Sequence, residues 1–163
     1  MNEKKYLLNQ LYGQEGIRAI AQRIHSIAAL LEKALKQLGF EQLNKQYFDT
    51  LRIALPDTVT TQEIRTIALS KEVNLYYAED GQIGISIDET TNLAALNKLI
   101  AIFATAAGKS PIAIESIATD SQLLPIHTRQ SASLTHEVFC NYHTETEMMR
   151  YIKRLERKDI SLA

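Results

Sequence analysis

Residues 14 to 38 carry the pattern that most constrains how this chain can fold. Apolar side chains recur there at intervals of three and four residues, which places them on one face of an α-helix. They are Ile17, Ile20, Ala21, Ile24, Ile27, Ala28, Leu31, Leu35 and Leu38. Gly39 follows directly, and glycine readily takes the left-handed backbone conformation that ends many helices. We therefore predict a long amphipathic helix that ends at this glycine.

The segments that follow are short and alternate between strand and helix patterns. Residues 47–54 are rich in strand-forming side chains, so we predict a strand there. Thr60 precedes Glu63 by three residues, which is the spacing of a capping box at the start of a helix. We predict that this helix ends near Lys71.

A hairpin and a further helix are predicted next. Residues 74–78 and 83–88 have strand composition, and Asp-Gly between them suits a tight turn. Gly84, inside the second of these strands, would allow another group to approach the backbone closely. A second amphipathic helix, closed by Gly108, is indicated by Leu93, Leu96, Leu99, Ile100 and Phe103.

Taken together, residues 13–108 predict a two-layer α+β domain. Two long helices would cover one face of a small sheet whose last two strands are antiparallel. After Gly108 the periodicity weakens, and we predict a linker with a short helix around Ile112–Ile117. A last helix begins near Thr144. The predicted parts are an N-terminal leader (1–12), an α+β small domain (13–108) and a linker arm that ends in a helix (109–163).

Composition excludes several classes of protein. The 163 residues carry a net charge of -1, which argues against a general nucleic-acid binder. The longest apolar run, Leu93–Ala107, is shorter than the ~20 residues that a membrane-spanning helix needs. No signal peptide is visible, and a single cysteine excludes an intramolecular disulfide. A cytoplasmic location is the expectation.

No cluster of side chains predicts a metal site or a nucleophile. The histidines, His25, His127, His136 and His143, lack the spacing of metal ligands. Glu147 lies near His143, but it is better explained as the capping partner of Thr144. Cys140 has neighbouring histidines, yet nothing orients a base toward it, and we predict a half-buried structural cysteine.

Three segments are informative about family membership as well as about secondary structure. They are LYGQEGIRAIAQRIHSIAALLEKALKQLGF at 11–40, YFDTLRI at 47–53 with AEDGQIGISIDET at 78–90, and LTHEVFCNYHTETEMMRYIKRLERKDISL at 134–162. In order and spacing they resemble the P-protein family of the glycine cleavage system, the decarboxylating glycine dehydrogenases that depend on pyridoxal phosphate. The resemblance covers about residues 11–162.

The resemblance implies the fold and the chemistry of a larger protein. The chain resembles the small domain that closes the N-terminal half of a P-protein, with the connection into the C-terminal half. Such a domain belongs to the aminotransferase-like fold (fold type I) of pyridoxal-phosphate enzymes. The complete enzyme decarboxylates glycine on the cofactor, which acts as an electron sink, and passes aminomethyl to the lipoyl-bearing H-protein.

Departures from the family limit what this chain is expected to do alone. It lacks the His-Lys pair whose lysine holds pyridoxal phosphate, so the resemblance assigns it no catalytic residue and no bound cofactor. It stops just before the family's Ser-Cys-Thr-Met segment, and its first ten residues do not match. We therefore expect an internal fragment that is inactive by itself and that serves as scaffold and interface.

The arm supplies the candidate functional residues. His136, Tyr142, His143, Glu145 and Arg150 lie where no core requires polar groups, so we predict that they contact another domain or the way into the active site. The plainer alternative is that Thr144 and Glu145 only begin a helix and that the others are solvated. Expected partners are the remainder of the P-protein and, through the full enzyme, the H-protein; a homodimer is left open.

A second hypothesis is an independent binding or regulatory module, without catalysis, that descends from a piece of a P-protein. The unfamiliar opening MNEKKYLLNQ is its motivation. Recovery of an unrelated partner from an extract would favour this hypothesis. Recovery of the H-protein or of a complementary P-protein half would favour the first.

Overall fold

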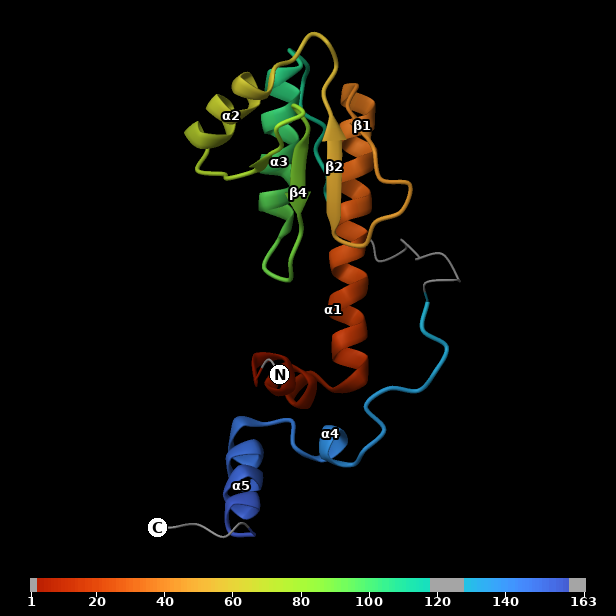
Figure 1. Ribbon diagram of the computed structural model, residues 1–163, viewed down its shortest axis with the longest axis vertical. Helices are drawn as coiled ribbons and strands as arrows, with labels where there is room; N and C mark the ends of the chain where they lie inside the picture. Colours follow the sequence, from red (N-terminus) through yellow and green to blue (C-terminus); the bar gives the residue numbers. More distant parts are fainter. Residues whose placement is uncertain (1–2, 118–127, 159–163) are drawn as a thin grey trace. The chain divides into compact units, whose positions relative to one another are not determined.

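The computed structural model describes residues 3–117 and 128–158, with only the backbone for residues 3–11 (Figure 1). The chain divides into two compact units, Met1–Ile20 with His127–Ala163 and Ala21–Ile126. Parts of the predicted leader, linker and arm, namely residues 1–2, 118–127 and 159–163, lie outside the described ranges.

The long helix is confirmed as α1 (Glu3–Leu38). Its helical backbone begins earlier than the sequence pattern indicates, and Gly13 interrupts it with φ 61° and ψ -171°. Only glycine takes such a conformation without steric cost. At the other end Gly39 has φ 96° and its N–H donates to Lys36 O at 3.1 Å, which confirms the predicted stop.

The second unit contains a four-stranded sheet in the order β1-β2-β4-β3, with every neighbouring pair antiparallel. The strands are β1 (Glu41–Gln42), β2 (Thr50–Ala54), β3 (Tyr76–Tyr77) and β4 (Ile83–Ser86). The predicted strands are present but shorter than expected, and β1 was not predicted. The antiparallel pairing of the last two strands is confirmed.

One face of this sheet is buried and the other is open. Leu51 and Ile53 of β2 lie opposite Ile85 and Ile83 of β4, and all four side chains are buried. Of the alternate residues of both strands, Thr50, Arg52 and Ser86 are exposed, and Ala54 and Gly84 are partly exposed. This alternation is the period-two pattern of a sheet with a single covered face.

Helices cover the buried face, so the α+β class is confirmed. Figure 1 shows β2 in front of the C-terminal half of α1 and β4 in front of α3 (Leu93–Ala106), with α2 (Thr61–Ser70) beside α3. Their buried side chains form one core with the strands, and the largest of them include Phe103, Ile27, Leu31, Leu35, Ile64, Leu96 and Ile100. The predicted capping box of Thr60 and Glu63 begins α2.

The helix predicted around Ile112–Ile117 is wrong, because residues 110–117 have no helical structure. Instead Ile112 and Ile114 pack against the core while Ala113 between them is exposed. The Asn97 side chain fixes this segment: its amide nitrogen donates to Ile114 O and its oxygen accepts from Ile114 N, both at 2.9 Å. The Asn97 side chain thus satisfies the Ile114 N–H and C=O groups, which would bond to other backbone groups in a helix.

In the other unit, the last predicted helix is confirmed as α5 (Glu145–Glu156). Thr144 and Glu147 form its capping box, as the spacing predicted. A single short turn, α4 (Val138–Asn141), precedes it and was not predicted.

Candidate functional site

Among the predicted site residues, Tyr142 lies at the centre of a compact cluster. Its ring stacks on that of Tyr151 from α5, with centroids 4.5 Å apart and planes at 23°. The Arg154 guanidinium lies 5.4 Å from both ring centroids and donates a hydrogen bond to the Tyr142 hydroxyl. A cation over two stacked rings is stabilised by their electron-rich faces. Tyr142 therefore fastens the segment before α5 to the helix itself.

Sequence reasoning missed Tyr151 and Arg154. Their spacing of three residues places them one turn apart on α5, and this was the only signal in the sequence. Tyr142 lies outside the helix, so its stacking depends on how the chain turns at residues 142–144. That turn leaves no periodic trace in the sequence.

His136 and His143 have local contacts within the same unit. His136 Nδ1 accepts a hydrogen bond at 3.2 Å from the N–H of Val138, the first residue of α4. His143 lies beside the kink of α1, where a Cβ built on Gly13 would come 3.3 Å from its Cε1. Both the backbone conformation of Gly13 and the nearby imidazole ring therefore disfavour any side chain at position 13.

Glu145 and Arg150 are exposed residues of α5. Glu147, which we predicted to be a cap rather than a metal ligand, accepts from the Thr144 N–H at 3.2 Å. This bond is the largest cause that lowers the pKa of Glu147 below its usual range, and the hydrogen bond with the Thr144 side chain is the second. Within residues 3–117 and 128–158, no three histidine, cysteine or acidic side chains are grouped as metal ligands would be.

The expectation for Cys140 is corrected by the structure. Its thiol is exposed rather than half-buried, because α4 is only four residues long and buries none of them. His25 shows the opposite environment, since it is buried and its Nδ1–H donates to Phe48 O at 2.8 Å. His127 lies outside the described residues.

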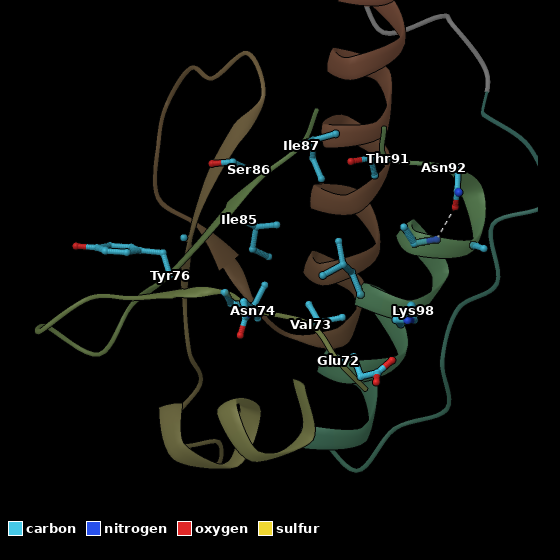
Figure 2. A pocket seen from close by; sticks show the side chains of 15 residues that line it. Glu72, Val73, Asn74, Tyr76, Ile85, Ser86, Ile87, Thr91, Asn92 and Lys98 are labelled. Carbon is cyan, nitrogen blue, oxygen red and sulfur yellow. Dashed lines mark hydrogen bonds between the residues drawn. The ribbon is translucent and has the colours of Figure 1, made fainter. Parts of the chain in front are cut away.

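An open cavity of about 670 Å³ lies between β4 and the first turns of α3. Figure 2 shows the side chains of Ile85 in β4, of Ile87 just after the end of β4, and of Val73, all of which line the cavity. Asn92 caps α3 by accepting from the Ala95 N–H at 2.9 Å. Lys98 and Glu72 are the charged residues of its lining. The lining thus combines apolar and polar side chains and carries one acidic and one basic residue.

No helix within the described ranges combines the length and apolar character needed to cross a membrane.

A sequence model of the family described as "Glycine cleavage system P-protein" matches residues 4–103. The expectation that the first ten residues do not match the family is therefore wrong from residue 4 onward. A glycine dehydrogenase (decarboxylating) of Bacteroides fragilis (strain YCH46) is 63% identical over 152 residues, which are 93% of this chain. The enzymes of that name from Bacteroides thetaiotaomicron and Flavobacterium johnsoniae are 62% and 41% identical, again over 93% of the chain. The chain spans about 16% of the length of each of these relatives. It belongs to the glycine cleavage system P-protein family.

Proposed function

We propose that this chain is part of a decarboxylating glycine dehydrogenase and serves there as scaffold and domain interface. The observation that carries the proposal is the identity of 63% over nearly the whole chain to a relative about six times as long. The complete protein would decarboxylate glycine with pyridoxal phosphate and transfer aminomethyl to the lipoyl H-protein. It would act as a soluble cytoplasmic enzyme.

Within that protein, the two-layer unit corresponds in our proposal to the small domain of an aminotransferase-like fold. The antiparallel sheet covered by α1 and α3 supports this assignment. We retain the boundaries of a leader at 1–12, a small domain at 13–108 and an arm at 109–163. The core residues of the sheet and of α2 and α3 all fall inside the middle range.

The arm is proposed to contact the next domain or the way into its active site. His136, Glu145 and Arg150 are exposed, which leaves their polar groups accessible to a partner. Tyr142 holds the start of α5 through Tyr151 and Arg154, so these side chains are presented on an ordered turn. His143 is placed by the kink at Gly13. Ordered polar groups outside a core are typical of binding surfaces.

The cofactor itself does not fit the described residues. A lysine that binds pyridoxal phosphate covalently must lie within a pocket, together with a partner for the ring nitrogen. The lysines whose side chains the structure describes are all exposed. Lys98 borders the cavity, but its Nζ is directed to Lys71 O at 3.4 Å. We therefore place the cofactor elsewhere in the complete protein and derive no chemical step from this chain.

Complementation tests the proposed function. The parts of the Bacteroides fragilis relative outside the matched 152 residues would be expressed separately and assayed for exchange of labelled bicarbonate into glycine. We expect no exchange by those parts alone or by this chain alone, and exchange when they are combined. Exchange by this chain alone, or no gain on mixing, would contradict the proposal.

Labelling distinguishes the remaining alternative. We expect no stoichiometric adduct when the chain is treated with pyridoxal phosphate and borohydride and its intact mass is measured. One adduct at a single lysine would instead indicate a cofactor-binding function of its own. Sedimentation of the same sample would determine whether the chain forms a homodimer.

A further inference from the structure

One edge of β4 continues beyond the end of its neighbour, next to the cavity. β3 pairs with β4 only through Tyr76 with Gly84 and Tyr77 with Ile83. The same register would bring Leu75 opposite Ile85 and then Asn74 opposite Ser86, but β3 begins only at Tyr76, so neither pair belongs to the ladder. β4 itself continues to Ser86 because β2 pairs with it along its other edge.

The backbone of Ser86 is directed toward this unpaired edge. Ile87 N–H donates to Asp49 O at 3.0 Å on the β2 side, and Ala78 N–H donates to Gln82 O at 2.9 Å on the β3 side. Successive residues of an antiparallel strand direct their N–H and C=O groups to opposite sides. Ser86 therefore directs both groups to the side of β3, where the ladder has no further strand residue to receive them.

The surroundings of this edge suit an extended peptide. Apolar side chains from three segments, Val73, Leu75, Ile85, Ile87 and Leu99, line the cavity together with polar ones, which include Asn74 and Asn92. At its border the Tyr76 ring lies over Gly84, where a Cβ would come 3.0 Å from the ring, and 71% of Tyr76 is exposed. A free strand edge, a pocket that offers apolar side chains and an exposed aromatic side chain are the parts from which strand-addition sites are built.

We propose that this cavity binds an extended, uncharged segment from the remainder of the P-protein polypeptide. The segment would pair with Ser86 through its backbone and insert an apolar side chain between Ile87 and Leu99. Its flank would pack against the Tyr76 ring. The site is thus a docking point for a strand that extends the sheet beyond β3.

The occupant is chosen from the length of the family's chain and from the charge of the site. About five sixths of the Bacteroides fragilis relative lies outside the matched residues, so the missing polypeptide would be at a high effective concentration. One acidic and one basic residue, Glu72 and Lys98, border the cavity. This balance favours an uncharged segment over an anionic or cationic ligand. The inference rests on the proposed function.

Hydrogen exchange and two matched variants test the inference. This chain would be mixed with the parts of the Bacteroides fragilis relative outside the matched 152 residues, and exchange of the Ser86 amide would be followed. We expect it to slow by about tenfold or more on binding. Ala94→Phe would fill the cavity from the exposed first turn of α3 and weaken binding about tenfold or more. Ala113→Phe, also exposed but outside the cavity, is the control and should bind as the original chain does.

Each other outcome has a distinct meaning. Binding that leaves the Ser86 amide unprotected, or that Ala94→Phe does not weaken, overturns the docking site and leaves the proposed function standing. Absence of any binding by the unaltered chain overturns both. Protection of Ser86 in the chain alone at high concentration, together with dimer formation, assigns the site to a second copy and overturns the proposed occupant.

Discussion

At the scale of single residues, Glu72 has a backbone conformation that favours glycine. Its φ is 56°, and it follows the C-cap of α2 at Lys71. The next residue, Val73, donates its N–H to Ala68 O at 2.9 Å, which completes a helix-ending turn of the kind that glycine usually occupies. A left-handed conformation costs about 1–2 kcal/mol for a residue with a Cβ.

Replacing Glu72 therefore has an outcome that depends on the side chain. We expect Glu72→Gly to raise the free energy of unfolding by up to about 1 kcal/mol, because relief of strain exceeds the added flexibility of the unfolded chain. Glu72→Val should lower it by about 1 kcal/mol or more, since a β-branched residue fits this conformation poorly. Urea denaturation measures both; equal stability of the two variants would contradict the argument.

Tyr47 and Glu32 form the clearest pH-dependent contact. The Tyr47 hydroxyl donates to Glu32 Oε2 at 2.6 Å. Burial, and then the hydrogen bond to the Glu32 carboxylate and its negative charge, raise the pKa of Tyr47 above its usual range. The folded state thus favours the neutral phenol. The phenol of the unfolded chain ionises near about pH 10. The contribution of neutral Tyr47 to the free energy of unfolding is therefore complete below that pH and is lost as the pH rises further.

Tyr47→Phe should change this alkaline response. We expect the variant to be less stable at neutral pH, because Glu32 loses its donor, and to lose less stability than the original chain above about pH 10. Urea denaturation at both pH values gives the comparison. Tyr77, whose pKa is also raised by burial, is present in both proteins and so acts as an internal control. Parallel losses in the two proteins would contradict the assignment to Tyr47.

At the scale of elements, Asn97 joins α3 to the extended segment that crosses it. Asn97→Ala removes both partners of the Ile114 backbone, and we expect the free energy of unfolding to fall by about 1–3 kcal/mol. Asn97→Asp keeps the acceptor for the Ile114 N–H but loses the donor, so it should be intermediate. Denaturation and exchange of the Ile114 amide measure the effect. An alanine variant as stable as the original chain would mean that apolar packing alone holds the segment.

Elements with long periodicity or specific end signals were predictable from sequence. The repeat of Ile27, Leu31 and Leu35 required a helix, and the capping hydroxyls of Thr60 and Thr144 marked two helix starts. β1 could not be predicted, because a two-residue strand has no periodicity and exists only through its pairing with β2. A helix was predicted around Ile112–Ile117, but this segment is not helical. Its backbone bonds the Asn97 amide and its isoleucines pack against the core.

The candidate site was less accessible to sequence reasoning. The role of Thr144 with Glu147 follows from local spacing, and it was predicted. The stack of Tyr142 on Tyr151 and the exposure of Cys140 depend on tertiary placement. The cavity beside β4 depends on where β3 stops pairing, and no residue in the sequence marks that point. The functional assignments of the arm residues stay predictions.

At the scale of the whole molecule, the two units differ in how much apolar surface they bury. α3 contributes a row of buried side chains that includes Leu96, Ile100 and Phe103. In α5 the described buried residue is Met148, whereas Met149, Ile152 and Leu155 are 59%, 48% and 45% exposed. Local opening requires less free energy where fewer apolar contacts must be broken.

Hydrogen exchange of the isolated chain should therefore separate the units. We expect amides of α5 to exchange markedly faster than those of α3, which should approach the rate set by global unfolding. Mass spectrometry of exchanged peptides can resolve the two helices. Equal protection would show that α5 belongs to the same cooperative unit as the sheet. Added parts of the relative should slow exchange in α5 if the arm is an interface.

One of the two borders between the units falls inside a helix. Ile20 and Ala21 belong to different units, yet they are consecutive residues of α1. A break between them would leave the new helix start with four N–H groups lacking helical partners. Recombination between related genes should consequently spare this border. We expect the two units to be inherited as one block, with natural fission and fusion points outside residues 14–38.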